Sequence, residues 1–128
     1  ELEALDPEKG AYYGGQTKDV RPYIASCSAV VLPSYYREGI PKILIEALAM
    51  GRPVITTDMP GCRETVTDGE NGYVTEARSA DDLYRVLKKF ILLSREERLE
   101  MGRRSRMLAE EKFDEKKVIS VYLEILKR

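Results

Sequence analysis

Short continuous apolar runs along the chain predict the strands of a sheet. The runs at 29–32 (AVVL) and 53–57 (PVITT) are bounded by turn residues and are typical of buried parallel strands. Weaker strand signals lie at 10–13 and 73–75. An average open sheet has roughly five or six strands, so a sheet built from these runs is expected to be incomplete on its N-terminal side.

Apolar residues at helical spacing lie between and after these runs, and capping residues mark where the helices are expected to begin. The expected caps are Thr17, Ser79, Ser94 and Asp114. Ser79 with Asp82, and Ser94 with Glu97, resemble capping boxes, and the charged helix after Ser94 is expected to run to about Lys112. The residues expected to face the core from the first two of these helices are Val20, Tyr23, Ile24, Cys27, Leu83, Val86, Leu87, Phe90 and Ile91. Strands alternating with helices, followed by a helical tail, predict an α/β, Rossmann-like doubly wound parallel sheet.

The most informative helix runs from Lys42 to Met50, after Pro41, because it is almost wholly apolar yet contains Glu46. Such a helix is expected to be buried, and a carboxylate inside it is costly unless it is paired. Glu46 therefore forms either a structural ion pair or a contact with a ligand. Glu38 precedes the helix N-terminus, where free amides and the helix dipole favour an anion. An anion site between two carboxylates suits a ligand that carries both phosphate and hydroxyl groups.

The amino-acid composition excludes several classes of function. The 128 residues are enough for one modest domain, with 43% hydrophobic and 34% charged residues and a net charge of −1, so no nucleic-acid surface is indicated. No apolar run approaches the roughly 20 residues of a membrane span. The chain has no histidine, which excludes His-based nucleophile systems and His-ligated metals.

We find no signal peptide and expect a cytoplasmic protein in which Cys27 and Cys62 are reduced and structural. The chain begins at Glu1 rather than Met, and we expect it to be a processed or excised piece.

A series of motifs occurs in a fixed order between Asp19 and Val74. They are Pro-Ser at 33–34, Arg-Glu-Gly-x-Pro at 37–41, the glutamates at 38 and 46, Ala-x-x-x-Gly-x-Pro-Val at 47–54, Pro-Gly-x-x-Glu at 60–64 and Asp-Gly-x-Asn-Gly at 68–72. Together they resemble the C-terminal domain of retaining glycosyltransferases of the GT-B fold, specifically family four, the glycosyl transferases group one. The charged helix with Met101-Gly102, and Phe113 before a closing helix, extend the resemblance over nearly the whole chain.

The resemblance implies a nucleotide-sugar donor site around the two glutamates. By motif position, Glu46 would accept hydrogen bonds from the ribose hydroxyls, and Glu38 would contact the transferred sugar as the catalytic residue, without acting as a covalent nucleophile. The implied substrate-binding residues are Glu38, Gly39, Ile40, Pro41, Lys42 and Glu46. The amides of Gly39, Ile40 and Lys42 would meet the diphosphate and stabilise its charge as it leaves, whereas Pro41 has no N–H to donate.

The family also implies what lies beyond this chain. We expect the donor to be a UDP-sugar and the acceptor to be a saccharide or lipid-linked molecule held by an N-terminal domain that this chain lacks. Residues 1–112 would form part of the donor domain, and 113–128 its C-terminal helix. We expect the piece to be inactive alone, to work in surface or capsular polysaccharide biosynthesis, and to need no cofactor or metal, because no Asp-x-Asp occurs. The full-length enzyme could associate peripherally with a membrane.

Three other functions remain open at this point. One is a related GT-B enzyme, such as a sucrose or glycogen synthase, and another is a nucleotide-sugar epimerase. A third is a stand-alone nucleotide-sugar binding or regulatory module, which would need a complete, closed sheet. A dinucleotide-dependent oxidoreductase is disfavoured, because no Gly-x-Gly-x-x-Gly follows a strand.

Overall fold

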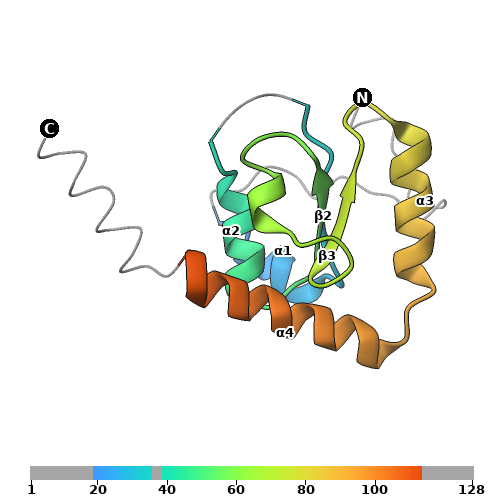
Figure 1. Ribbon diagram of the computed structural model, residues 1–128. Helices are drawn as coiled ribbons and strands as arrows, with labels where there is room; N and C mark the ends of the chain where they lie inside the picture. The colour runs from blue at the N-terminus through green and yellow to red at the C-terminus, as the bar shows by residue number, and fades with distance from the viewer. Residues whose placement is uncertain (1–18, 36–38, 114–128) are drawn as a thin grey trace, which may run out of the picture.

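The computed structural model describes residues 19–35 and 39–113. The elements in this part of the chain are α1 (Arg21–Ser26), β1 (Val30–Leu32), α2 (Lys42–Ala49), β2 (Val54–Thr57), the 3₁₀ helix η3 (Arg63–Thr65), β3 (Gly72–Thr75), α3 (Ala80–Ile91) and α4 (Arg95–Lys112) (Figure 1).

The three strands form a parallel sheet in the order β1-β2-β3, which confirms the α/β prediction. Val30 of β1 is aligned with Val54 of β2, and Ile55 of β2 with Tyr73 of β3. All four residues of β2 are buried, as expected for a central parallel strand. Val31 of β1 is 39% exposed, so one face of β1 is uncovered in the described part of the chain.

Two hydrophobic clusters lie on opposite faces of the sheet, because successive strand residues point to opposite sides. Val54 packs with Leu44 and Leu48 of α2 in one cluster, and Ile55 packs with Phe90 of α3 in the other. In Figure 1, α2 and α3 accordingly lie on either side of the strands, and α4 runs across them below. The long helix α4 contributes to both clusters, so it ties the two layers together.

The amino edge of the sheet, where the strands begin, is closely packed against α4. Gly102 of α4 approaches the backbone of Gly51 so closely that a Cβ at Gly102 would lie 2.3 Å from the Gly51 carbonyl oxygen. At Gly72, a Cβ would lie 1.7 Å from the Val54 carbonyl oxygen. These two contacts leave no room for a side chain, and they explain why glycine stands at both positions.

Asn71 of the Asp-Gly-x-Asn-Gly motif is buried at the same edge with its side chain fully engaged. Its Oδ1 accepts from the Thr67 amide (2.7 Å), and its Nδ2 donates to the Thr65 carbonyl (3.0 Å) and to Ser105 Oγ (3.3 Å). A buried amide with these partners fixes the turn before β3 against α4. This motif therefore has a structural role.

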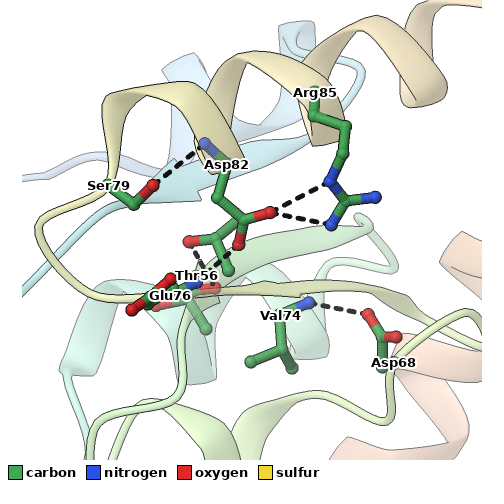
Figure 2. A network of polar contacts seen from close by, with 8 residues as sticks. Thr56, Asp68, Val74, Glu76, Ser79, Asp82 and Arg85 are labelled. Carbon is green, nitrogen blue, oxygen red and sulfur yellow. Dashed lines mark hydrogen bonds and ion pairs between the residues drawn. The ribbon is translucent and has the colours of Figure 1, made fainter.

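The expected caps at Ser79 and Ser94 are confirmed as the N-caps of α3 and α4. Ser94 and Glu97 form the reciprocal capping box, and α4 ends at Lys112. Ser79 Oγ accepts from the Asp82 amide (3.1 Å), but the Asp82 carboxylate does not return this contact. It instead accepts from the Glu76 amide (2.7 Å) and from Arg85 (Figure 2). The capping box expected at Ser79 is therefore wrong in its second half, because the turn after β3 brings the Glu76 amide into reach.

Three burial predictions need correction. Tyr23 is 52% exposed, because α1 has only six residues and buries Ile24 alone. Ile91 is 68% exposed at the end of α3, where Phe90 takes the inward position. The helix α2 is only half-buried, since the Glu46 side chain is 25% exposed. Thr17 itself lies outside the described residues, but the expected cap there is wrong, because α1 begins at Arg21 with Val20 as its N-cap. The expected strand at 10–13 and the final helix after Asp114 also lie outside the described residues.

Candidate site at the carboxyl edge of the sheet

The start of α2 lies at the carboxyl edge of the sheet, because the connection after β1 leads directly into it. Two buried threonines of β2 hold the beginning of this connection. Thr56 Oγ1 donates to the Leu32 carbonyl (2.7 Å), and Thr57 Oγ1 donates to the Ser34 carbonyl (2.6 Å). In open parallel sheets, ligands bind at this edge.

The tip of α2 has unused backbone donors. Pro41 is the N-cap, in extended geometry (φ −62°, ψ 131°), and its carbonyl accepts from the amides of Leu44 and Ile45. Among the described residues, no acceptor bonds the amides of Lys42 and Ile43. Free amides at a helix start attract anions. The motif had pointed to Lys42 but not to Ile43.

Glu46 forms a loose pair with Lys42 on the same helix. The Lys42 Nζ lies 3.8 Å from Glu46 Oε1, and the Lys42 side chain is 88% exposed. An exposed pair at this distance contributes little to stability. The structure thus gives Glu46 the ion pair that was one of the two hypotheses from the sequence. The contact is loose enough for a ligand to replace it.

A second ion pair borders this one. Arg21 donates from Nε (2.8 Å) and Nη2 (2.9 Å) to Asp19, and these bonds lower the pKa of Asp19 to about 2. The Arg21 pKa is raised, first by Asp19 and to a smaller extent by the field of Glu46. The field of Lys42 in turn contributes to a smaller extent to the lowered pKa of Asp19, so the charged groups at the starts of α1 and α2 act on one another.

Of the residues expected to bind substrate, the structure places Gly39, Ile40, Pro41, Lys42 and Glu46 at this end of α2. Gly39 has open space where a Cβ would lie, and Ile40 is 37% exposed. Glu38, the expected catalytic residue, lies outside the described residues. Its role stays a prediction.

The Pro-Gly-x-x-Glu motif follows β2 at the same edge. Glu64 Oε2 accepts from the Gly61 amide (2.5 Å), which closes the turn that leads into η3. Gly61 has φ 91°, a conformation that favours glycine. This bond explains the spacing of the motif by local geometry.

Three hollows lie at the opposite edge, along α4. One, of about 300 Å³, is lined by residues that include Asn71, Glu70, Glu100 and Arg104. Its charges pair with each other, because Arg104 bonds Glu70 (3.0 Å) and Glu100 (3.2 Å). We place the candidate site at the tip of α2, because the residues of the motif meet there and two neighbouring backbone amides have no acceptor among the described residues.

Comparisons with known proteins agree with this choice of fold. A family model described as glycosyl transferases group 1 matches residues 2–107. An uncharacterized glycosyltransferase of Haemophilus influenzae is 33% identical over 109 residues, which are 84% of this chain and 30% of the relative. The N,N'-diacetylbacillosaminyl-diphospho-undecaprenol alpha-1,3-N-acetylgalactosaminyltransferase of Campylobacter jejuni is 32% identical over 91 residues, which are 71% of this chain and 23% of the relative.

Among solved structures, Anabaena HepE in complex with UDP matches with a TM-score of 0.82 and 22% identity, covering 94% of this chain and 33% of HepE. The chain therefore spans about a third, or less, of the length of these proteins. In the described part of the chain, no helix is long and apolar enough to cross a membrane.

Proposed function

This chain belongs to the group 1 glycosyltransferases, and from that membership we propose that it is the donor-binding part of a retaining hexosyltransferase that uses a UDP-sugar. The observation that carries the proposal is the tip of α2, where free amides and an accessible carboxylate lie on one helix end. The resemblance to HepE, solved in complex with UDP, supports the choice of nucleotide.

In this proposal the ligand groups divide along α2. The diphosphate meets the amides of Gly39, Ile40, Lys42 and Ile43, where the helix dipole also favours negative charge. Glu46, one helical turn further on, exchanges its loose contact with Lys42 for the ribose hydroxyls. Lys42 is then free to turn its ammonium group toward the phosphates.

The same groups contribute to catalysis. The bond between the sugar and the diphosphate breaks, and negative charge builds on the departing phosphate oxygens. Donors that are already in place at the helix tip stabilise that charge without reorganisation. Glu38 contacts hydroxyls of the transferred sugar and orients it, and the acceptor hydroxyl attacks on the side that retains the anomeric configuration.

The acceptor is a saccharide or a lipid-linked molecule, held by a part of the enzyme outside this chain. The name of the Campylobacter relative, which includes an undecaprenol diphosphate, supports a lipid-linked acceptor. We place the reaction in the cytoplasm and in surface polysaccharide biosynthesis, with peripheral membrane association of the whole enzyme. The chain alone binds donor weakly and transfers no sugar.

Calorimetric titration of the chain with UDP, GDP and ADP tests the donor site. We expect UDP to bind in the millimolar range, and we expect Glu46→Ala to weaken binding at least tenfold. Glu110→Ala is the matched control, because Glu110 also pairs with a basic residue four positions away on an exposed helix face. If no nucleotide binds, or if Glu46→Ala binds like Glu110→Ala, the proposed site is wrong.

A further inference from the structure

A hollow of about 280 Å³, between α4 and the segments that precede β1 and β2, is lined by charges of one sign. Its lining contains three arginines, Arg52, Arg95 and Arg98, together with Leu99, and we call it the arginine hollow. Among the described residues that line it, none is acidic. Several positive charges around one concave surface raise the local concentration of anions. The arginine hollow therefore favours a negatively charged ligand.

The three arginines of the hollow have no carboxylate partners in the part of the chain that the structure describes. By contrast, Arg103, Arg104 and Arg106 in the later turns of α4 each pair with a glutamate. Arg52 donates to neutral backbone carbonyls, including that of Ala25 (2.8 Å), so its positive charge is not neutralised. Guanidinium groups are well suited to phosphate oxygens, because they present several N–H donors in one plane.

Arg98 connects the arginine hollow to the end of α3. Its Nη2 donates to the Ile91 carbonyl (2.7 Å), and its guanidinium carbon lies 5.4 Å from the centroid of the Phe90 ring. Its Nε is buried without a partner among the described residues. Arg98 is thus held in place by α3, and the protein does not use all of its donors.

The first two turns of α4 separate acidic from basic residues, although the charges alternate in the sequence. Positions 95, 98 and 99 line the arginine hollow, and the three glutamates at positions 96, 97 and 100 line a second hollow of about 450 Å³. Residues three and four apart share one side of a helix, which explains both groupings. The side of α4 at the arginine hollow therefore carries positive charge that these glutamates do not cover.

Exposed apolar side chains border the arginine hollow. Leu99, which lines it, is 55% exposed. Ile91 is 68% and Leu92 is 79% exposed, and Arg98 ties this end of α3 to the hollow. In Figure 1 the turn from α3 into α4 lies at the lower right, away from the tip of α2. Apolar residues gathered at an exposed turn beside basic ones are typical of proteins that lie on a membrane surface.

We propose that the α3–α4 corner, formed by Ile91, Leu92, Arg95, Arg98 and Leu99, docks on a membrane surface that contains anionic phospholipids. Lipid phosphates bind at the arginine hollow, and the apolar side chains enter the headgroup region. The unpaired positive charge favours an anionic surface, and the apolar border favours a lipid surface over a free anion. The inference rests on the peripheral membrane association in the proposed function, and it does not depend on the donor site.

Sedimentation of the chain with lipid vesicles tests this proposal. Vesicles of phosphatidylcholine alone are compared with vesicles in which about a third of the lipid is phosphatidylglycerol. We expect binding to the anionic vesicles that is at least about tenfold tighter than binding to the neutral ones. High salt should remove most of this difference, because it screens the attraction between the arginines and the lipid surface.

Variants of α4 locate the contact. Arg95→Gln should weaken binding to anionic vesicles about fivefold, as expected for one basic residue near a charged surface. Arg104→Gln is its control, because it removes the same charge from the side of α4 that lines the other two hollows. Leu99→Ser should weaken binding about threefold or more, since an apolar contact is lost. Met107→Ser is the apolar control, because Met107 is 53% exposed but lies away from the arginine hollow.

Three results would overturn the inference. The first is equal binding to neutral and anionic vesicles, and the second is an equal loss in Arg95→Gln and Arg104→Gln. The third is binding of inorganic phosphate, seen as amide NMR shifts at Arg95 and Arg98, without binding to vesicles, because the hollow would then be a site for a free anion.

The same measurements separate this inference from the donor site. If the chain binds UDP but not anionic vesicles, the docking surface is wrong and the donor site stands. If the chain binds anionic vesicles and loses this binding in Arg95→Gln and Leu99→Ser, but binds no nucleotide, the docking surface stands and the donor site is wrong.

Discussion

The two edges of the sheet differ in how completely their polar groups are satisfied. At the amino edge, Asn71 is 2% exposed and bonded through both ends of its amide, and Gly72 leaves no space for a Cβ. At the carboxyl edge, the amides of Lys42 and Ile43 find no acceptor among the described residues, and Gly39 faces open space. The turn before β3 at the amino edge is closed by bonds within the protein, although Arg98 Nε of α4 is buried there without a partner among the described residues, whereas the tip of α2 offers neighbouring backbone donors.

The difference indicates that one edge serves stability and the other serves ligand binding. Interactions that are already satisfied contribute to folding, whereas donors without acceptors contribute only when a ligand arrives. The amino edge also holds α4 against both layers of the core. We therefore expect substitutions at the amino edge to change stability, and substitutions at the carboxyl edge to change ligand binding with little effect on stability.

The largest effect is expected at Gly72. A Cβ in Gly72→Ala would overlap the Val54 carbonyl oxygen, which β2 holds in place, so we expect a loss of about 3–5 kcal/mol in unfolding free energy or failure to fold. Urea denaturation followed by circular dichroism measures this loss. Gly39→Ala, which meets no atom within 4 Å, is the control and should cost less than about 1 kcal/mol. Equal stability of the two variants would remove the contrast between the edges.

A somewhat smaller loss is expected at Asn71. Asn71→Ala leaves the Thr67 amide and the Thr65 carbonyl without their partner in a buried place, so we expect a loss of about 2–3 kcal/mol. Ser105→Ala removes two longer contacts of the Ser105 hydroxyl, from the Asn71 side-chain amide (3.3 Å) and to the Asn71 carbonyl (3.4 Å), and should cost about 1 kcal/mol. The comparison would be contradicted if Asn71→Ala weakened UDP binding while leaving the urea midpoint unchanged.

A helix cap provides an effect of intermediate size. Ser94→Ala removes one half of the capping box that begins α4, and the expected loss is about 1 kcal/mol. Ser79→Ala should cost a similar amount, because its hydroxyl accepts the same kind of amide bond. Both changes are measured by thermal unfolding. UDP affinity after Ser94→Ala should be unchanged, and a loss there would mean that α4 belongs to the site.

The smallest effect is expected from Asp19, at the exposed start of α1. Its folded pKa of about 2 lies below the unfolded value of roughly 3.9, since Arg21 binds the carboxylate. A lowered pKa stabilises the folded state above pH ~4, and this contribution is lost as the pH falls toward 2. Asp19→Asn should flatten the stability profile in that window only, and high salt should reduce the difference. Above pH ~4 the variant should be less stable by an amount that does not vary with pH, and a difference that varied with pH near 7 would contradict the assignment to Asp19.

Much of the fold followed from local patterns. The apolar run PVITT predicted the buried strand β2. The capping box at Ser94, with the charged helical pattern after it, predicted α4 as far as its last residue. These features depend on residues that are close in sequence, so the pattern contains the information. That the sheet is incomplete on its N-terminal side remains a prediction; among the described residues β1 is an outer strand, and Val31 on it is 39% exposed.

Other features depended on contacts between distant segments, which a pattern cannot reveal. The bond between Asp82 and the Glu76 amide depends on the turn after β3, and the left-handed backbone of Arg78 depends on the same turn. The exposure of Glu46 depends on which elements flank α2. The sequence predicted the start of α2 at Lys42, which the structure confirms, but the roles of Glu38 and Glu46 in binding remain predictions.

The central claim is that the ligand binds at the carboxyl edge, around the tip of α2. Amide NMR of the ¹⁵N-labelled chain during titration with UDP tests it directly, since each edge has its own reporters. We predict shifts at Gly39, Lys42, Ile43 and Glu46, with none at Asn71, Gly72 or Ser105. Shifts confined to the amino edge and α4 would contradict the account.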